Sequence, residues 1–543
     1  MTPGATTLRS SRGLAWGVLA AYALGFFALV FACASNTPQG DDYAAILEPA
    51  TRWPTLETWR ERLALLGEQH FSHRLVLTKS LVAAQITLHG TVNFLALQVF
   101  GWLALIVLAG LLVSSSPDIR ATPWLATPIV LVIFQPQGFT NFQSAMQAVQ
   151  NLGILLVAFV ALQATVSPRR GAGVASVLLA VASAFVSANG LLLGPIAAAT
   201  AALRRRYALA AAHAIASGLA MLVYFRGFRF PIGSAFDLGE GLTKAAIMAG
   251  GAASFDRLPL LFVGLAGAAL LVIALVTLFF PPRDEAAPEL RPFLGFLLAS
   301  VFLAALGRLG WRNDYMTQDR YRVYGCLIAV SLYLLLLARP FGRTRIFRLA
   351  SLTVATGFAI VSFATTLPNM ISSARWAEAQ AINAQLGQPF FMTSGGGWDE
   401  AARLLTVAEQ RGVYRLPRVL SVNELAALRM APKSLVSVPV KFQPNGGRLG
   451  FDLVAERSAN TARPEFAVLA FGEDRVVLPA LLHRAPIGEL LRHGHLLAST
   501  TTFVVPREVA AASPESVTLT AFGRDHDGQL APLWQSVAHV PRI

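Results

Sequence analysis

The sequence predicts an all-α polytopic membrane domain of about eleven transmembrane helices, followed by an extracytoplasmic domain made of a helical neck and a β-sandwich. Two observations predict this class. Hydrophobic residues make up 55% of the 543 residues and charged residues only 14%, whereas roughly a quarter of the residues of a soluble domain are charged. The apolar residues also gather in runs of about 20, which is the helix length that crosses ~30 Å of hydrocarbon.

Seven apolar runs are long enough to span a bilayer as helices. They cover residues 14–34, 91–113, 144–164, 207–225, 258–280, 322–338 and 349–367. Four shorter runs belong in the membrane as well, because their apolar surface has no other place in so hydrophobic a chain. They cover residues 122–134, 174–187, 190–203 and 292–306. The count is therefore eleven spans, give or take one.

Arginines in short loops orient this domain. The loops "SPRRG", "RRRY" and "ARPFGRTRIFR" fall on the same side as the N-terminus with its Arg9 and Arg12, and such a bias marks the cytoplasmic side. A bare count does not decide the orientation, since residues 1–367 place 14 Lys and Arg inside and 13 outside. The first run also admits a second interpretation, a secretory signal ending at "ACAS". The outer basic residues lie in three longer loops among acidic residues, which indicates a site.

The composition changes near Pro368. From there to the C-terminus 17 Lys and Arg stand against 15 Asp and Glu, so the preceding part holds +12 of the total charge of +14. "SARWAEAQAINAQL" and "WDEAARLLTVAEQRG" have helical spacing. Later segments alternate or are rich in β-branched residues between turn residues, as strands are: "SLVSVPVKF", "EFAVLAFG", "DRVVLPALL", "TTFVVP" and "SVTLTAFG". We predict a transmembrane domain over 1–367, a helical neck over 368–431 and a periplasmic β-rich domain over 432–543.

The first outer loop, residues 34–90, holds two adjacent carboxylates, Asp41 and Asp42, in "GDDYAAILEPATRW". Either carboxylate could cap the short helix that follows. "WPTLETWRERLALLG" predicts an amphipathic helix that lies in the membrane interface. The same loop ends with four further polar candidates: Glu68, His70, His73 and Arg74. Their spacing invites a zinc interpretation but matches no ligand motif, so no metal and no cofactor is predicted.

The other outer polar groups lie at the ends of later spans. The candidates among them for binding a substrate are Asn141, Asn189, Arg308, Arg312, Arg320 and Tyr321, and Arg226 and Arg229 lie in a further outer loop. Each has an ordinary alternative, because arginines near span ends also bind lipid headgroups and Asn189 sits in a tight turn. Their co-occurrence on one face favours a site. The two cysteines, Cys33 and Cys326, provide neither a disulfide framework nor a metal cluster.

A carboxylate with several arginines at an outer membrane face suits a lipid-linked phosphate sugar. Guanidinium groups bind phosphate oxygens in pairs, and a carboxylate can take the proton of an acceptor hydroxyl as it attacks the anomeric carbon. The arginines would then stabilise the charge that builds on the departing phosphate.

The chain resembles the GT-C superfamily of polyprenyl-phosphate-sugar glycosyltransferases. The resemblance covers roughly residues 14–367 and is carried by "GDDY" early in a long first outer loop, with "EQHFSHR", "SANGLLLGP" and "DRYRVY" similar to bacterial multispanning members without an assigned reaction. It implies that Asp41 or Asp42 is the base and that Arg320, with the arginines near it, holds the donor phosphate. The histidines and the "ANGLLLGP" turn match no role in characterised members.

The resemblance implies an enzyme of a bacterial inner membrane with a cytoplasmic N-terminus and a periplasmic tail. Its partners would be the bilayer, a polyprenyl-phosphate sugar donor and an envelope glycan or lipid acceptor, with no nucleic acid. Three alternatives stay open: a flippase, a lipid-linked glycan ligase or polymerase, and a non-catalytic scaffold. The tail is expected to shape access for the acceptor, with structural roles for His483, His493 and His495, and sugar stacking by Trp398 or Trp534 as a lesser possibility.

Overall fold

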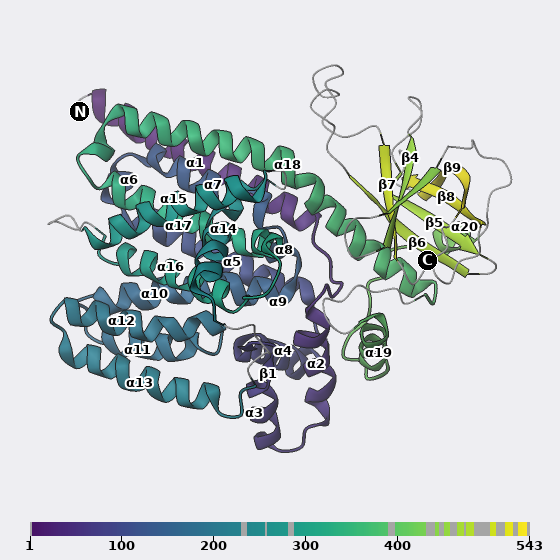
Figure 1. The fold of residues 1–543 in the computed structure, drawn as a ribbon, viewed down its shortest axis with the longest axis horizontal. Helices are drawn as coiled ribbons and strands as arrows, with labels where there is room; N and C mark the ends of the chain where they lie inside the picture. The colour runs from purple at the N-terminus through teal and green to yellow at the C-terminus, as the bar shows by residue number, and fades with distance from the viewer. Residues whose placement is uncertain are drawn as a thin grey trace. The chain divides into compact units, whose positions relative to one another are not determined.

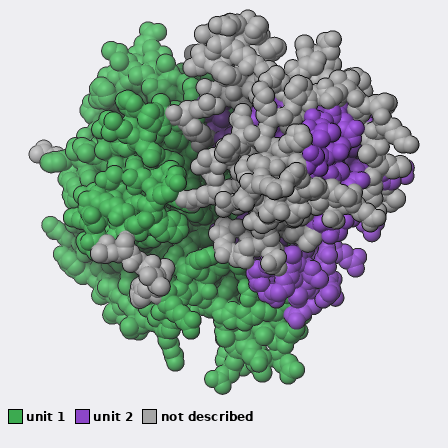
Figure 2. Space-filling view, turned by 45° about the vertical axis from the view of Figure 1, so that its right-hand side comes forward, with its two compact units in different colours: residues 1–32, 44–363 green, residues 33–43, 364–543 purple. Residues whose placement is uncertain are grey.

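The computed structural model describes residues 3–229, 236–255, 258–280, 287–388, 397–429, 440–444, 450–456, 464–471, 474–482, 500–506, 516–524 and 530–539. The chain forms two compact units (Figure 2). Unit 1 comprises residues 1–32 and 44–363, and unit 2 comprises residues 33–43 and 364–543. A short piece of the first predicted loop, with both of its adjacent aspartates, thus belongs to unit 2. His483, His493 and His495 lie outside the described residues.

Seven helical segments in the described part of the chain are long and apolar enough to cross a membrane. They are α1 (Pro3–Ala32), α5 (Phe94–Ser115), the run α9–α10 (Ala145–Val166), α13 (Tyr207–Phe225), α15 (Leu260–Phe279), α17 (Asp319–Leu337) and α18 (Arg345–Gln385). Each overlaps one of the seven long runs predicted from the sequence. Those seven helices are confirmed, and within unit 1 they lie side by side as a bundle (Figure 1).

The shorter apolar runs form shorter elements. Three of them are helices: α11 (Ala172–Ser183), η6 with α12 (Ala188–Leu192 and Leu193–Leu203) and α16 (Leu290–Leu306). The fourth, 122–134, is divided into η3 (Pro123–Ala126) and α7 (Thr127–Ile133), each with a proline in its first turn. Proline is tolerated in a first turn but interrupts a helix interior. This run is therefore too short to cross a bilayer as one straight helix.

One buried helix, α14 (Leu238–Gly250), is absent from the spans predicted from the sequence. It carries Glu240 and Lys244, and these charges lower its apolar character. Lys244 is nevertheless fully buried and forms an ion pair with Glu240 at 3.2 Å. The helix packs closely on α15, where a Cβ atom on Gly250 would lie only 2.0 Å from the Val263 carbonyl oxygen. Glycine thus lets the two backbones approach each other.

The chain between α1 and α5 forms a small helical subregion with one hairpin. Its elements are η1 (Tyr43–Leu47), α2 (Glu48–Arg52), η2 (Trp53–Thr55), α3 (Trp59–Gly67), β1 (Gln69–His70), β2 (His73–Arg74) and α4 (Val76–His89). The predicted amphipathic helix is present as α3 but begins later than expected, at Trp59. The Thr58 side chain accepts from the Glu61 amide, and the Glu61 side chain accepts from the Thr58 amide. This capping box sets the start of the helix.

The remaining elements of unit 1 are short. They are α6 (Pro117–Ala121), η4 (Pro136–Gly138), α8 (Thr140–Gln143), α9 (Ala145–Gln147), η5 (Ala148–Leu152), α10 (Gly153–Val166), η7 (Gly251–Ala253), η8 (Asn313–Thr317) and η9 (Phe341–Arg343). The element η5 is a π-helical turn inside the run from α9 to α10. Such turns are rare and occur frequently at functional sites.

The longer part of unit 2, residues 364–543, begins with the second half of a 41-residue helix. The helix α18 continues through Pro368, so the last predicted span and the first neck helix are one element. Two further helices follow, α19 (Gly397–Gln410) and α20 (Val422–Arg429). The segment "WDEAARLLTVAEQRG" is therefore confirmed as a helix, as is the helical character of the neck.

The β-rich part of unit 2 is one antiparallel sheet of seven strands in the order β3-β4-β7-β6-β5-β8-β9. The strands are β3 (Val440–Pro444), β4 (Gly450–Glu456), β5 (Phe466–Phe471), β6 (Asp474–Leu481), β7 (Thr500–Pro506), β8 (Ser516–Arg524) and β9 (Leu530–His539). The sequence led us to expect two stacked sheets. The structure has one sheet instead, because β6 pairs with strands on both of its sides. It pairs with β5 through Asp474 to Pro479 and with β7 through Ala480 and Leu481.

Candidate functional site

Two guanidinium groups of unit 1 lie against one tyrosine ring. Arg308 follows α16, and Arg320 occupies the first turn of α17. The Cζ atoms of Arg308 and Arg320 lie 4.7 and 5.0 Å from the centre of the Tyr321 ring. Tyr321 is buried, and its hydroxyl accepts a hydrogen bond from Arg308. Contacts of a guanidinium with an aromatic face are favourable, so three of the residues predicted from the sequence form one cluster.

Arg308 has donor capacity left over. Its Nη1 donates to the Ala304 carbonyl at 2.8 Å and its Nη2 to Tyr321. Its Nε is buried, with no hydrogen-bond partner among the described residues. No carboxylate within the described ranges forms an ion pair with this guanidinium. A buried N–H that nothing accepts is costly, and a charge-assisted bond to an anion would satisfy it.

His73 stands beside these arginines as a neutral imidazole. Burial lowers the pKa of His73 to about 3, with further lowering by Arg308, His70 and Arg320. Its Nδ1 accepts from the Ala188 backbone amide and from the Gln150 side chain, both at 3.2 Å. This assigns the remaining proton to Nε2. In the described part of the chain nothing is hydrogen-bonded to that Nε2, so His73 offers a neutral donor next to two cations.

The partner of His73 comes from the π-helical turn η5. The turn carries Gln150 and Asn151 within the candidate span Ala145–Val166. Gln150 donates to Ser187 Oγ at 3.0 Å as well as to His73, and Asn151 donates to Asn141 Oδ1 at 2.7 Å. One extra residue in the turn thus directs two consecutive amides towards the polar cluster. Sequence reasoning missed Gln150 and Asn151, although polar residues within a span are themselves a signal of function.

The "SANGLLLGP" turn brings a third side-chain amide, that of Asn189, to the cluster. A Cβ atom on Gly190 would lie 1.9 Å from the Ser183 carbonyl oxygen, so glycine lets η6 fold against the end of α11. Asn189 then donates to Ser300 Oγ at 3.2 Å and to the Tyr324 hydroxyl at 3.0 Å. Its Oδ1 is buried and has no hydrogen-bond partner among the described residues. Asn189 therefore does more than satisfy the backbone of its turn.

Asn141 orients the arginine helix. Its Nδ2 donates to the Arg320 carbonyl at 3.1 Å, and the neighbouring Thr140 amide donates to the Asp319 carboxylate at 3.3 Å. Both bonds connect α8 with the first turn of α17. Asn141 therefore helps to position Arg320. Both polar atoms of its side chain are hydrogen-bonded within the chain, Nδ2 to the Arg320 carbonyl and Oδ1 to Asn151.

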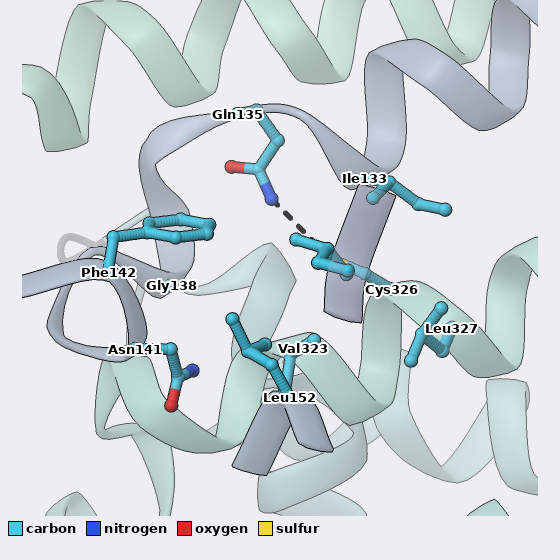
Figure 3. A pocket seen from close by; sticks show the side chains of 10 residues that line it. Ile133, Gln135, Gly138, Asn141, Phe142, Leu152, Val323, Cys326 and Leu327 are labelled. Atoms are coloured by element: carbon cyan, nitrogen blue, oxygen red, sulfur yellow. Dashed lines mark hydrogen bonds between the residues drawn. The ribbon is translucent and has the colours of Figure 1, made fainter. Parts of the chain in front are cut away.

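A small cavity lies next to this contact. Its volume is about 20 Å³, and its lining residues are Leu105, Ile133, Gln135, Gly138, Asn141, Phe142, Leu152, Val323, Cys326 and Leu327. The Gln135 amide nitrogen points to the Cys326 sulfur at 3.6 Å (Figure 3). The space suits one water molecule and is far too small for a sugar.

Three other predicted residues hold the local structure together. Glu68 receives two hydrogen bonds from Arg52, both at 2.7 Å. Arg74 donates to backbone carbonyls, among them that of Tyr224 at 2.6 Å. Arg312 pairs with Asp314 at 2.7 Å on the exposed surface. Their charged groups pair with carboxylates or backbone carbonyls of the chain, whereas the buried Nε of Arg308 has no hydrogen-bond partner among the described residues.

Asp41 and Asp42 belong to unit 2 and differ in exposure. Asp42 is completely buried and accepts from the Gln39 amide at 3.1 Å, and Asp41 is partly exposed. Burial, followed by the charge of Asp42, raises the pKa of Tyr43. Asp42 thus helps to close the turn that begins at Gln39, a role close to the capping alternative.

Within the described ranges, no group of three or more His, Cys, Asp or Glu side chains is arranged to hold a metal ion. Comparisons with protein-family models, with curated proteins and with solved structures find no match for this chain.

Proposed function

We propose that this chain is a membrane glycosyltransferase that moves a sugar from a polyprenyl-phosphate donor to an envelope glycan or lipid. One observation carries the proposal: Arg308 and Arg320 lie on the same tyrosine ring, and the Nε of Arg308 is buried without an acceptor in the described part of the chain. Paired guanidinium groups suit a phosphate whose negative charge grows as the sugar leaves.

The cluster also contains uncharged groups that can bind the sugar of the polyprenyl-phosphate sugar. The Nε2 proton of His73 can bond to a phosphate or sugar oxygen without adding charge, and the Oδ1 of Asn189 can accept from a sugar hydroxyl. Tyr321 positions both arginines through its ring, and Asn141 positions Arg320 through the Arg320 carbonyl. Glu68, Arg74 and Arg312 are left to structural roles in this proposal.

The general base remains a prediction from the resemblance to GT-C enzymes. Between the two candidates we favour Asp41, because it is partly exposed whereas Asp42 is fully buried. Asp41 would remove the proton from the acceptor hydroxyl during attack on the anomeric carbon. No metal or other cofactor is assigned to the step.

The proposal places the chain in a bacterial inner membrane, with a cytoplasmic N-terminus and unit 2 in the periplasm. The shorter helices α11, α12 and α16 and the η3–α7 segment would complete about eleven membrane-embedded segments. A lipid-linked glycan ligase or flippase would use a similar phosphate site. Measuring sugar transfer separately from phosphate binding distinguishes these alternatives.

Binding of polyprenyl phosphate to the full-length protein in nanodiscs tests the phosphate site. We expect Arg308→Lys and Arg320→Lys to weaken binding about tenfold to a hundredfold, since lysine keeps the charge and loses the planar fork. Arg312→Lys is the matched control, because its side chain is exposed and paired with Asp314. Unchanged binding in the Arg308→Ala, Arg320→Ala double variant would overturn the site.

Envelope glycans and glycolipids of a deletion strain test the reaction itself. We expect the deletion to remove one sugar from one envelope component, and Asp41→Asn to restore it poorly although polyprenyl phosphate still binds. Full rescue by the Asp41→Asn, Asp42→Asn double variant would remove both carboxylates as bases. An intact sugar on a carrier lipid that stays on one leaflet would instead favour a flippase.

A further inference from the structure

The β1–β2 hairpin is fastened to the C-terminal end of the candidate spanning helix α13. Gln69 exchanges two hydrogen bonds with the Arg229 backbone, at 2.7 and 2.8 Å. Arg74 donates to the carbonyls of Tyr224 and Arg226, both at 2.6 Å, and the Tyr224 hydroxyl donates to the Ser72 carbonyl at 3.2 Å. These hydrogen bonds hold the hairpin against the end of α13.

An exposed phenylalanine lies at the tip of this hairpin in an unfavourable backbone conformation. Phe71 has a φ of 47°, a left-handed value that bulky residues rarely adopt. Its side chain is 64% exposed. Glycine or asparagine would fit such a turn with less strain. Strained residues of this kind occur where function requires a particular side chain. Exposure of a large apolar ring to water is also unfavourable, so neither feature is explained by folding stability.

The adjoining end of α13 presents further exposed aromatic and cationic groups. Phe225 is 42% exposed and packs against Phe228 with ring centres 5.4 Å apart. Arg226 and Arg229 are exposed, and neither forms an ion pair with a carboxylate within the described ranges. We call Phe71, Phe225, Arg226 and Arg229 the hairpin face. It combines apolar rings with positive charge, which matches the boundary between acyl chains and anionic headgroups.

We propose that the hairpin face is a lipid-binding surface that sits in the headgroup layer of an anionic bilayer. Phe71 and Phe225 reach the upper acyl region, and Arg226 and Arg229 bind headgroup phosphates. A protein partner is less suited, because α13 must end at a membrane surface if it spans the bilayer and the hairpin is bonded to that end. The hairpin also contains His73, so the same element connects the lipid surface with the candidate site. The proposal holds whatever reaction unit 1 performs.

Site-specific fluorescence in vesicles tests the lipid-binding surface without any assay of activity. Phe71→Cys, in a background of Cys33→Ala and Cys326→Ala, is labelled with an environment-sensitive fluorophore. Gln410→Cys on the exposed surface of α19 is the matched control. The vesicles contain phosphatidylcholine with or without phosphatidylglycerol. The fluorescence is quenched either by iodide dissolved in the water or by spin-labelled lipids in the bilayer. We expect the label at 71 to be quenched several-fold more by lipid-borne than by aqueous quencher, and the label at 410 to show the reverse.

Two further variants separate a lipid role from a folding role. Arg226→Gln with Arg229→Gln should remove the increase in lipid quenching at position 71 that phosphatidylglycerol causes. The variant Phe71→Gly is combined with Phe225→Cys, which carries the label. Its midpoint of thermal unfolding should be equal to or higher than that of Phe225→Cys alone, because the strained φ at position 71 is relieved. Its quenching by spin-labelled lipids should nevertheless be weaker. The proposal is overturned if iodide quenches positions 71 and 410 equally, or if Phe71→Gly lowers the midpoint and leaves lipid quenching unchanged.

Discussion

His73 is an imidazole that its surroundings keep neutral. Burial and three neighbouring basic side chains lower its pKa to about 3, compared with about 6.5 for an exposed histidine. Between these two values the unfolded chain binds a proton that the folded chain does not. The free energy of unfolding therefore falls as the pH decreases from about 6.5 towards 3, by up to about 1.4 kcal/mol per pH unit from this group.

The variant His73→Asn tests this pH dependence. Asparagine keeps an acceptor near the position of Nδ1 for the Ala188 amide but does not titrate. We expect the difference in unfolding free energy between wild type and variant to shrink by more than 1 kcal/mol between pH 7 and pH 5. Thermal or urea unfolding in detergent measures it. Parallel curves for the two proteins would show that His73 is protonated as easily in the folded chain as in the unfolded one.

At the scale of elements, the packing of α14 on α15 depends on glycine. A Cβ atom on Gly250 would meet the Val263 carbonyl oxygen at 2.0 Å, whereas one on Gly264 would lie 3.5 Å from the nearest atom, the Ile247 Cγ1. We expect Gly250→Ala to lower the free energy of unfolding by about 1–3 kcal/mol, as overpacking commonly does. Gly264→Ala should change it by less than about 0.5 kcal/mol. Equal unfolding midpoints for both variants would contradict the close helix contact.

Unit 2 contains an element junction built around Arg524 of β8. Its guanidinium pairs with Glu378 of α18 at 3.2 Å, Glu424 of α20 at 3.4 Å and Glu465 at 3.3 Å. Burial raises the pKa of Glu378, and Arg524 opposes this rise. One arginine thus connects two helices with the sheet and balances three carboxylates.

Replacing Arg524 by methionine should lower the stability of unit 2 by about 1–2 kcal/mol at neutral pH, since three carboxylates then repel one another. The loss should shrink as the pH falls, because protonation of Glu378 removes part of the repulsion. Hydrogen exchange of β8 amides measures it. Arg403→Met is the control, because its pair with Glu400 is exposed and spaced i,i+3 on one helix. Similar exchange in both variants would show that the junction contributes little.

At the scale of the whole molecule, the decisive prediction is the topology. Single cysteines at Ser167 and Arg345 should react only with reagents on the cytoplasmic side, and one at Gln410 only from outside. The reason is the arginine bias of the short loops and the odd number of predicted crossings before unit 2. If the cysteine at Gln410 reacts from the cytoplasmic side, unit 2 lies in the cytoplasm and not in the compartment of the proposed acceptor, and the predicted topology is wrong.

Elements with a strong local signal could be predicted from the sequence alone. Runs of about 20 apolar residues are long enough to span a bilayer wherever they occur, so each of the seven long helices overlaps a predicted run. The ends of α1 and α18 were not predicted, because α1 begins 11 residues earlier and α18 ends 18 residues later than the apolar run. The strands β5 to β8 were likewise predicted from a local signal, their β-branched composition and turns. The strands β4 and β9 were missed, because "GFDLVAE" and "LAPLWQSVAH" contain glycine, proline and charge that weaken the pattern.

Tertiary structure alone decided which polar residues meet. No local pattern indicates that Gln150 and Ala188 bond to one imidazole, or that Arg308 shares a tyrosine with Arg320 while Arg74 and Glu68 are used within the chain. Tertiary structure also decided that α14, despite its charged residues, is buried on one face. It likewise decided that β6 pairs with both β5 and β7 and so connects the strands into one sheet. Contacts between distant residues depend on how helices and strands pack, and that is set by the shape of whole elements rather than by the spacing of residues within one.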